Sequence, residues 1–312
     1  MKKKYVVTGG SGFIGSGLVR ALQAREDAQI AVIDNLLTGH RKNLDGLSQP
    51  VEFHQVDIRD YDAIAPVIAG ADTVFHLAAI PSVPKSIADP IPSHDVNING
   101  TFAVLRAAKD GGVRRVVYAA SSSAYGDTDV LPKVESMKTM PKSPYALQKL
   151  VGEYYCNLFT TCFGLETIGL RFFNVYGPRQ DPMSPYSGVL SLFMKHLIAR
   201  TSPTIHGDGE QTRDFTFVED VAGLIIKGST AGAPGTTYNA GNGGRYSLNT
   251  IWSMLQKIED VQIPPIYGPG RAGDVRDSQA DTTAATRDLG HDPQFSIEEG
   301  LSRTLAWYKT SL

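Results

Sequence analysis

The stretch TGGSGFIG at residues 8–15 decides the fold, because it lies between an apolar run, Tyr5–Thr8, and an amphipathic run, Phe13–Ala24. It holds two overlapping glycine spacings, G-x-G-x-x-G from Gly10 and G-x-x-G-x-x-G from Gly9. Glycine permits a tight strand-to-helix turn and lets a pyrophosphate approach the backbone, where the helix N-terminus offers unpaired N–H groups. Taken alone the stretch could be a flexible turn, so its surroundings must decide.

An acidic residue, Asp34, follows the next apolar run, Ile30–Ile33. At the end of a second strand, a carboxylate accepts hydrogen bonds from a ribose 2′-hydroxyl and repels a 2′-phosphate. The pattern therefore predicts a dinucleotide site that takes NAD rather than NADP. The alternative is that Asp34 is a turn residue before Asn35.

Short runs rich in Val and Ile alternate with helical stretches through the first half of the chain. Such alternation is typical of an α/β fold with a doubly wound, Rossmann-like parallel sheet. The further expected strands are Val51–Val56, Thr73–Leu77, Arg115–Ala120 and Thr167–Phe172, and the further expected helices are Val96–Ala108 and Tyr145–Phe163. After Asn174 prolines become frequent, which predicts a smaller C-terminal α/β lobe. We therefore expect a cofactor-binding domain at 1–173, a substrate lobe at 174–312, and a segment at 215–240 that returns to the sheet.

Composition is that of an ordinary globular protein, with 42% hydrophobic and 20% charged residues and a formal net charge of −2. Neither nucleic acid nor an anionic membrane is therefore expected as a partner. The apolar runs fall short of the ~20 residues of a membrane span, and Tyr5–Thr8 is too short for a signal-peptide core. The spacing of Cys156 and Cys162 on an expected helix disfavours a disulfide or a metal site, so a reducing cytoplasm fits.

Tyr145 and Lys149 form a Y-x-x-x-K spacing that puts both side chains on one face of the expected helix. A free phenol has a pKa of about 10, and a cation held nearby lowers it. The pair is therefore a candidate general base, although the spacing is frequent by chance. The serine triplet Ser121–Ser123 closes the preceding strand. One of these serines could relay a proton between a substrate hydroxyl and Tyr145, or simply cap a turn.

Two further places invite a hydrogen-bonding role. Asp57 and Ile58 follow the third expected strand and could contact an adenine, although Asp57 could instead cap a helix ahead of Asp60. Asn97 and Asn99 interrupt an apolar helix, where asparagine is mildly unfavourable. We predict that Asn97 supports the loops of the site; the alternative is a surface position.

Taken together, the motifs resemble those of one known family. In chain order they read TGGSGFIG (8–15), DNL (34–36), HLAA (76–79), SSSAYG (121–126), YALQK (145–149), RFFNVYGPR (171–179), GDGEQTRD (207–214) and RAGD (271–274). The set resembles the extended short-chain dehydrogenases/reductases that act on nucleotide sugars. Among these it is most similar to the NAD-dependent UDP-hexose 4-epimerases, the UDP-glucose and UDP-N-acetylglucosamine 4-epimerases. The resemblance covers essentially the whole chain.

The resemblance implies tightly held NAD, a UDP-sugar substrate and a set of site residues. The residues expected at the cofactor are Gly9, Gly12, Phe13, Ile14, Gly15, Asp34, Asn35, Leu36, Thr38, Gly39, Asp57, Ile58, Leu77, Ala78, Ala79, Asn97, Ser121, Tyr145, Lys149 and Phe173. Those expected at the UDP-sugar are Ser82, Ser122, Ser123, Tyr145, Asn174, Val189, Arg213, Arg271, Asp274 and Ser278. The residues expected to be catalytic are Tyr145, Lys149, Ser121 and Ser123.

In the implied reaction, Tyr145 as phenolate removes the proton of the sugar 4-hydroxyl while NAD accepts the C4 hydride. Lys149 and the positive nicotinamide ring would lower the pKa of Tyr145. The 4-keto sugar then turns within the site and takes the hydride back on its opposite face, which inverts C4.

The family's diphosphate-binding positions match Arg213 and Arg271, and Asp274 would accept from the uridine ribose. A guanidinium can grip phosphate in a fork that an ammonium cannot form. The alternative for Arg213 is an ion pair with Asp214 or Glu210 on a surface turn.

Two features concern the sugar. The run RQDP at 179–182 resembles members that act on UDP-N-acetylhexosamines, and Ser278 matches a position where members that reject N-acetylated sugars carry a bulky Tyr. A small side chain would leave room for an acetamido group; the alternative is that Ser278 is a polar surface residue. The loop at 121–126 lacks the Asp or Glu of similar dehydratases and decarboxylases, which disfavours elimination chemistry.

Other readings stay open at this stage. The same scaffold could serve a UDP-glucuronate 4-epimerase, a UDP-sugar reductase, or a non-catalytic NAD-binding module. The family further implies a homodimer, in which helices at roughly Pro92–Lys109 and Tyr145–Phe163 of each subunit would form a four-helix interface.

Overall fold

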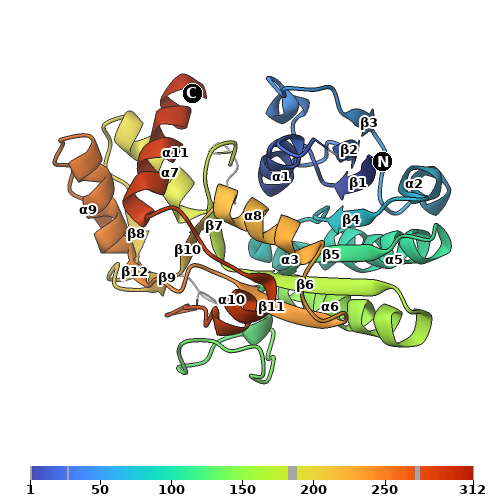
Figure 1. The fold of residues 1–312 in the computed structure, drawn as a ribbon. Helices are drawn as coiled ribbons and strands as arrows, with labels where there is room; N and C mark the ends of the chain where they lie inside the picture. The colour runs from blue at the N-terminus through green and yellow to red at the C-terminus, as the bar shows by residue number, and fades with distance from the viewer. Residues whose placement is uncertain (1, 27, 182–187, 271–274, 312) are drawn as a thin grey trace.

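The centre of the computed structural model is a seven-stranded sheet in which every pairing is parallel (Figure 1). The structure describes residues 2–26, 28–181, 188–270 and 275–311. In sheet order β11-β6-β5-β4-β1-β2-β3, the strands are Thr236–Ala240, Glu166–Phe172, Arg115–Ser121, Thr73–His76, Lys3–Thr8, Ala28–Ile33 and Glu52–His54. The predicted doubly wound α/β fold is confirmed.

The chain reverses its path across the sheet between β1 and β4. It adds β2 and β3 on one side of β1, returns to place β4 on the other side, and continues outward through β5 and β6. In open α/β sheets, ligands bind outside the carboxyl ends of the strands at such a switch point. Thr8 and His76 are the last residues of β1 and β4, so their ends mark where a site is expected.

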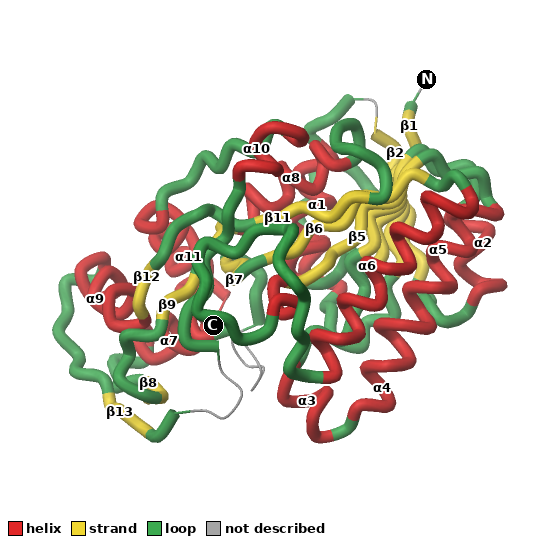
Figure 2. Tube along the Cα trace, turned by 90° about the horizontal axis from the view of Figure 1, so that it is seen from below, coloured by secondary structure: helices red, strands yellow, loops and turns green. Residues whose placement is uncertain are grey.

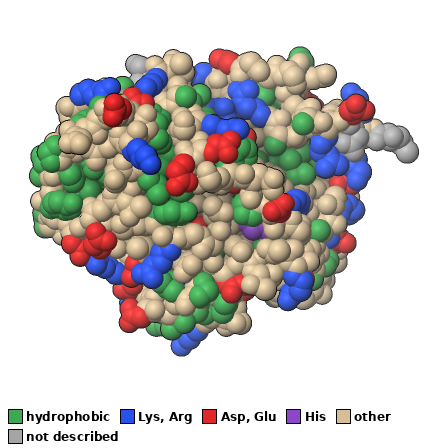
Figure 3. All heavy atoms as spheres, turned by 60° about the vertical axis from the view of Figure 1, so that its left-hand side comes forward, with side chains coloured by type: hydrophobic (Ala, Val, Ile, Leu, Met, Phe, Trp, Pro, Cys, Tyr) green, Lys and Arg blue, Asp and Glu red, His purple; other side chains and the backbone are tan. Residues whose placement is uncertain are grey.

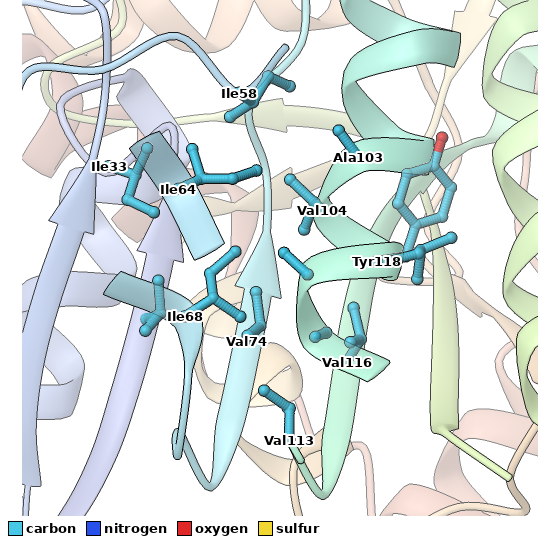
Figure 4. Close-up of a cluster of buried hydrophobic side chains, with 14 of the residues drawn as sticks. Ile33, Ile58, Ile64, Ile68, Val74, Ala103, Val104, Val113, Val116 and Tyr118 are labelled. Carbon is cyan, nitrogen blue, oxygen red and sulfur yellow. The ribbon is translucent and has the colours of Figure 1, made fainter. Parts of the chain in front are cut away.

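Helices cover both faces of the sheet, because successive side chains of a strand point to opposite faces. The helices are α1 (Phe13–Gln23), α2 (Tyr61–Ile68), α5 (Thr101–Asp110), α6 (Pro144–Phe163) and α8 (Val218–Gly228). On β1, Val6 belongs to the buried cluster under α2, α5 and α6, whereas Val7 belongs to the cluster under α1 and α8. Figure 2 shows the first group of helices along one side of the sheet, and Figure 4 shows part of its cluster.

The helix predicted at Val96–Ala108 is not α-helical throughout. Helix α4 (Pro90–His94) runs into a π-helical turn, η2 (Asp95–Gly100), which continues as α5. Such turns are rare and are frequent at functional sites. Here the turn carries Asn97, whose side chain bonds the backbone of Ile80 in the loop after β4.

The C-terminal part of the chain packs around a third cluster, which includes Phe193, Trp252 and Leu301. Of the segment expected to return to the sheet, Thr236–Ala240 forms the edge strand β11, whereas Phe215–Phe217 (β10) pairs with β7 in a separate two-stranded sheet. The remaining elements are η1 (Arg41–Leu44), α3 (Val83–Ala88), η3 (Ser122–Tyr125), β7 (Asn174–Tyr176), α7 (Val189–Ile198), β8 (Thr204–His206), β9 (Thr212–Arg213), β12 (Tyr246–Ser247), α9 (Leu248–Ile258), β13 (Ile266–Gly268), α10 (Thr283–Leu289) and α11 (Ile297–Ser311).

Acidic and basic side chains are interspersed on the face shown in Figure 3. Within the described ranges, no helix is both long and apolar enough to cross a bilayer. The same residues contain no group of three or more His, Cys, Asp or Glu side chains that could hold a metal ion. Cys156 is buried and Cys162 is exposed, and both are free thiols.

Candidate functional site

A cavity of about 700 Å³ opens at the carboxyl ends of β1 and β4, where the strand order reverses. This volume lies within the usual range for small-molecule sites. The turn at residues 9–15 lines it beyond β1, and Ser121 lines it at the end of β5, two strands along the sheet, together with Tyr145 and Lys149 of α6. The cavity therefore joins the predicted nucleotide turn to the predicted general base.

The glycine turn is built so that larger residues would not fit. Gly9 has a φ of +72°, and a Cβ there would lie 2.7 Å from the backbone nitrogen of Ala78. A Cβ on Gly15 would lie 2.1 Å from the carbonyl oxygen of Gly9. Gly9, Gly12 and Gly15 line the cavity, whereas Gly10 packs against Val32. The spacing that shapes the site is therefore G-x-x-G-x-x-G, and its open backbone fits the pyrophosphate of a dinucleotide.

Asp34 combines the two roles that the sequence left open. One carboxylate oxygen accepts from the backbone N–H of Ser11 at 2.8 Å, and the other accepts from that of Leu36 at 2.8 Å, which is a turn-forming bond. Asp34 also lines the cavity. Each carboxylate oxygen can accept a second bond, so the side chain can still receive ribose hydroxyls. Leu36 and Gly39 shape this loop but lie outside the described lining of the cavity.

Asp57 does not cap the following helix, because Asp60 does so by accepting from the backbone N–H of Ala63. Asp57 instead accepts from Asn35 at 2.9 Å and from Arg59. The hydrogen bond from Arg59 is the main reason that the pKa of Asp57 falls to about 2, against a smaller opposing effect of burial. Asp57, Asn35 and the neighbouring Ile58 all line the cavity.

A chain of buried hydrogen bonds links the end of β1 to the π-helical turn. The hydroxyl of Thr8 lies 2.8 Å from Nδ1 of His76, whose Nε2 lies 2.9 Å from the hydroxyl of Thr101. Thr101 donates to the carbonyl of Asn97, so His76 must donate from Nε2 and accept at Nδ1. Burial, and then the charge of Lys149, lower the pKa of His76 to about 3, which keeps this ring neutral.

Asn97 ties the loop after β4 to the helix that carries Tyr145. Its amide oxygen accepts from the backbone N–H of Ile80 at 2.8 Å, and its amide nitrogen donates to Gln148 at 2.9 Å. Gln148 in turn donates to Ser93 at 3.0 Å. Asn97 is fully buried but lies behind the cavity wall, whereas Asn99 is exposed.

Helix α6 presents Tyr145 and Lys149 to the cavity from its first turns. Its start is fixed by Ser143, which caps the helix by accepting from Ala146, with Pro144 in the first turn. Burial lowers the pKa of Lys149 to about 8, and its ammonium lies 4.6 Å from the ring centre of Tyr118.

Burial raises the pKa of Tyr145, and the group that opposes this rise is Ser121 through a hydrogen bond. The predicted lowering of this pKa depends on Lys149 together with the positive nicotinamide ring of NAD, and it stays a prediction. Desolvation disfavours the phenolate more than the chain's own charges favour it. The chain therefore positions Tyr145 and provides Ser121 as its hydrogen-bond partner.

The three serines Ser121–Ser123 differ in their contacts and in their position relative to the cavity. Ser121 caps η3 by accepting from the backbone N–H of Ser123 at 3.2 Å, and the two hydroxyl oxygens lie 2.8 Å apart. Ser121 lines the cavity, whereas Ser122 and Ser123 lie outside its described lining. Phe173 belongs to a small buried cluster with Tyr125 and also lines the cavity.

Asp214 is not the surface partner considered for Arg213, because it is buried. The guanidinium of Arg213 donates to the carbonyls of Thr212 and Arg276. Asp214 is completely buried and accepts three backbone N–H bonds at 2.9–3.0 Å, from residues Asn242, Gly243 and Ala280. Through these bonds Asp214 holds its own backbone in place, and therefore also that of its neighbour Arg213.

The other predicted substrate residues are spread around this backbone and the cavity mouth. Asn174 donates to the carbonyl of Asp214 at 3.2 Å, and Ser278 donates its backbone N–H to Thr212 at 3.1 Å. Ser278 is 8% exposed, so it is not the surface residue considered as an alternative. Ser82 caps α3 and lines the cavity, whereas Asn174, Val189, Arg213 and Ser278 lie outside its described lining. Arg271 and Asp274 lie outside the described residues.

Several lining residues lie outside the predicted set of site residues, although Gln180 and Asp181 belong to the RQDP run that the resemblance connects with N-acetylated sugars. Lys85 and the pair Gln180 and Asp181 line the cavity, and His40 faces it from the loop after β2. Nε2 of His40 lies 3.6 Å from the Asp181 carboxylate. Lys85 lies in α3, whereas His40, Gln180 and Asp181 stand on loops, and these positions are far apart in sequence.

The sequence matches the NAD-dependent epimerase/dehydratase family over residues 5–241. A UDP-glucose 4-epimerase of Mycolicibacterium smegmatis is 36% identical over 97% of this chain and 98% of its own. The structure of a UDP-N-acetylglucosamine 4-epimerase from Methanobrevibacter ruminantium, in complex with UDP-N-acetylmuramic acid, superposes with a TM-score of 0.95 at 35% identity and covers 100% of both chains. A UDP-glucose 4-epimerase from Thermotoga maritima, solved with UDP-glucose, has a TM-score of 0.94 at 34% identity over 99% of both chains.

Proposed function

The chain belongs to the NAD-dependent epimerase/dehydratase family, and from this premise we propose that it inverts C4 of a UDP-hexose through a transient 4-keto sugar. The observation that carries the proposal is the pairing of two sites in one cavity. The glycine turn at residues 9–15 lines it beyond β1, and Ser121 lines it at the end of β5, together with Tyr145 and Lys149. A cofactor that spans the cavity would bring its redox ring to the base.

The residues that would hold NAD are those with open backbone or free acceptor capacity in the cavity. Gly9, Gly12 and Gly15 would receive the pyrophosphate, and Asp34 would accept from the adenosine ribose. Lys149 would bond the nicotinamide ribose. Bound NAD supplies reversible oxidation and reduction at the sugar C4, and the protein supplies position and electrostatics.

Tyr145 would take the proton of the sugar 4-hydroxyl, with Ser121 orienting or relaying it. Because burial raises the pKa of the phenol, the phenolate needs stabilising partners, and Ser121 is one of them. The buried Lys149 supplies a cation at the same end of the cavity, since it stays largely protonated below its lowered pKa of about 8.

Replacing Ser121 with Ala should lower kcat at neutral pH by about 10–100-fold, because a hydrogen bond to a charged oxygen is lost. The phenolate is the active form, so activity rises with pH through the phenol pKa. Without Ser121 that pKa rises further, and the acid limb of the kcat–pH profile should move to higher pH. If the acid limb of the kcat–pH profile stays at the same pH in Ser121→Ala, Ser121 is not in the proton path. Ser123→Ala would then be the next variant to measure.

The C-terminal lobe would hold the UDP-sugar, with Arg213 and Arg271 at the diphosphate, Asn174 beside it, and Asp274 at the uridine ribose. The position of Arg213 supports this, because Asp214 fixes its backbone through three N–H bonds. The two relatives solved with UDP-sugars, at TM-scores of 0.95 and 0.94, also support it.

We further propose that the sugar pocket admits N-acetylated hexoses. Ser278 is buried and its backbone N–H donates to Thr212, so this small residue lies inside the C-terminal lobe rather than on the surface. The similarity to a UDP-N-acetylglucosamine 4-epimerase over the whole chain points the same way.

Enlarging the side chain in Ser278→Tyr should therefore lower kcat/KM for UDP-N-acetylglucosamine by at least about 100-fold, through steric exclusion costing several kcal/mol. The value for UDP-glucose should change by less than about tenfold. Ser278→Ala is the matched control and should keep both activities. Equal losses with both sugars in Ser278→Tyr would show that the position does not select the acetamido group.

Two enzymes on the same scaffold are distinguished by cofactor consumption. An epimerase needs no added NAD(H) and gives no net change in reduced nicotinamide, whereas a UDP-sugar reductase oxidises it in proportion to product. The absorbance of reduced nicotinamide should therefore stay constant while UDP-glucose converts. Stoichiometric consumption of reduced nicotinamide would identify the enzyme as a reductase rather than an epimerase. Turnover of UDP-glucuronate alone would change the assigned sugar but leave the assigned site as it is.

We propose a homodimer that forms through α5 and α6, which lie side by side on one flank of the molecule (Figure 2). Large apolar side chains of these helices are unusually exposed: Phe102 at 42%, Leu147 at 50%, Tyr154 at 57% and Leu158 at 49%. Such an apolar patch is typical of an interface. The free thiols Cys156 and Cys162 fit a reducing, cytoplasmic setting.

Light scattering should accordingly find two chains per particle for the wild type and one for Leu158→Lys, because a charge cannot be buried unpaired in an apolar interface. Val130→Lys, at an equally exposed apolar residue outside these helices, is the control and should stay dimeric. A monomeric wild type, or a dimer that survives Leu158→Lys, would contradict the assigned interface.

A further inference from the structure

A second cavity, of about 320 Å³, lies behind the loops of the first one, and we call it the cationic cavity. It is enclosed by α1, by η1 and the residue that follows it, by the loop after β7 and by α11. Its walls include Arg20, Lys42, Asn43, Asp45, Arg179 and Trp307. Among its described lining residues, three side chains carry a positive charge and one carries a carboxylate.

The two guanidiniums in the cationic cavity have donors left without acceptors. Nε of Arg20 and Nε of Arg179 are both buried, and neither has a hydrogen-bond partner among the described atoms. Arg20 uses another nitrogen to hold the carbonyls of Asn43 at 2.9 Å and Asp45 at 2.6 Å. Neither Nε is open to the cavity, so an anion there would meet the terminal nitrogens of the guanidiniums, and the two Nε donors are left unbonded by the fold, which is rare in folded proteins.

The cavity also holds like charges close together. Burial, and then the charge of Arg20, lower the pKa of Arg179 to about 10, against a smaller opposing effect of Glu219. Arg179 moreover has a φ of +71°, a backbone region that residues with a side chain rarely adopt. Arg179 is thus held in an unfavourable backbone conformation and beside a like charge, a combination that is frequent at ligand sites.

The helix end nearby offers only a partial balance for this charge. Trp307 and Ser311, in the last described turns of α11, line the cavity. A helix C-terminus carries about half a negative charge, which is less than the charge of the guanidiniums together. An anion would complete the balance and would accept from the terminal N–H groups of the guanidiniums.

We propose that the cationic cavity binds a phosphate group, either as free phosphate or as the end of a small phosphomonoester. Two guanidiniums and an ammonium match the oxygens of phosphate, since the arginine fork bonds oxyanions in pairs. The volume exceeds that of a single phosphate, and Trp307 provides an apolar wall for the rest of an ester.

The same loops wall the cationic cavity and the cofactor cavity. Asn43 donates to the carbonyl of Ser11 in the glycine turn at 2.9 Å, and the backbone of His40 donates to the same carbonyl at 3.0 Å. Gln180, the neighbour of Arg179, lines the cofactor cavity. A phosphate held between these loops would therefore stabilise the turn that receives NAD, and the coupling would be reciprocal.

Isothermal titration of the NAD-loaded dimer with inorganic phosphate tests the site, with saturating UDP present so that the phosphate positions of the active site are filled. The ionic strength is kept constant with sodium chloride. One saturable site per chain is expected, and Lys42→Gln and Arg179→Gln should each weaken the Kd at least tenfold. Lys42 is exposed and lies on the cavity rim, so Lys42→Gln should fold normally. Arg287→Gln, at an exposed cation of α10, is the control and should bind like the wild type.

A parallel titration with glycerol 3-phosphate separates the two sources. Tighter binding of the ester assigns the site to a phosphorylated metabolite, and equal or weaker binding assigns it to free phosphate. Phosphate should also slow NAD dissociation severalfold in the wild type but not in Lys42→Gln. The absence of saturable binding in the wild type, or the same Kd in all variants, would overturn the proposal, as would an equal effect on NAD dissociation in wild type and Lys42→Gln.

Discussion

Replacing Tyr145 with Phe should lower kcat for UDP-hexose epimerisation by about 10²–10⁴-fold, the usual contribution of a positioned acid–base group. The ring stays, so its packing stays, but the oxygen that takes the 4-hydroxyl proton is gone. Tyr145 lines the cavity with Ser121 at the end of β5, two strands along the sheet from the glycine turn, so NAD should still bind. Initial rates, together with the NAD content of the purified variant, measure both effects.

The structure supplies two checks on that result. Lys149 and Ser121 keep their own anchors without the phenol, since Lys149 packs over Tyr118 and Ser121 caps η3. The circular dichroism spectrum and the melting temperature of Tyr145→Phe should therefore stay close to those of the wild type. Activity within about threefold of the wild type would show that another group is the base, and loss of NAD along with activity would show that the cavity had collapsed.

Replacing Gly15 with Ala should reduce NAD affinity by at least about 100-fold. The new Cβ would lie 2.1 Å from the carbonyl oxygen of Gly9, a backbone atom that cannot rotate away. The first turn of α1 must then separate from the glycine turn, and the N–H groups that would receive the pyrophosphate move apart. Overpacking of this kind also costs roughly 1–3 kcal/mol of stability. Fluorescence titration of the apoprotein with NAD gives the affinity, and calorimetry gives the stability.

Gly223→Ala is the matched control for this prediction. Gly223 lies in α8, where an added Cβ meets nothing within 4 Å. Alanine in a helix is more favourable than glycine by roughly 0.5–1 kcal/mol, so this variant should be as stable as the wild type or more stable, with unchanged NAD affinity. If Gly15→Ala melted at a lower temperature but bound NAD normally, the glycine turn would be a structural feature only.

The fold was accessible from the sequence where local chemistry decides it. Runs such as Ile30–Ile33 are apolar on both faces because the strand is buried on both sides, and the glycines at 9–15 stand between a strand and a helix, where a tight turn is needed. The same holds for Tyr145 and Lys149, whose spacing on a capped helix fixes their common face. The family, the parallel sheet and NAD as cofactor were all predicted from such features and are confirmed.

What the sequence could not reveal depends on contacts between distant segments. Asn97 was predicted to support the loops of the site, but no local pattern encodes its partners, Ile80 and Gln148, or the π-helical turn at Asp95–Gly100 that carries it. The burial that raises the pKa of Tyr145 is likewise a property of the assembled site. Gln180 reaches the cavity only through the folding of a loop from the second half of the chain.

The most direct test of the central claim is proton NMR of UDP-N-acetylglucosamine and UDP-glucose incubated in D₂O with the purified protein and no added cofactor. Oxidation and reduction at C4 by the same cofactor predicts the C4 epimer of each sugar, with the original hydrogen retained at C4. Deuterium at C4, or no epimer from either sugar while NAD is demonstrably bound, would contradict the account.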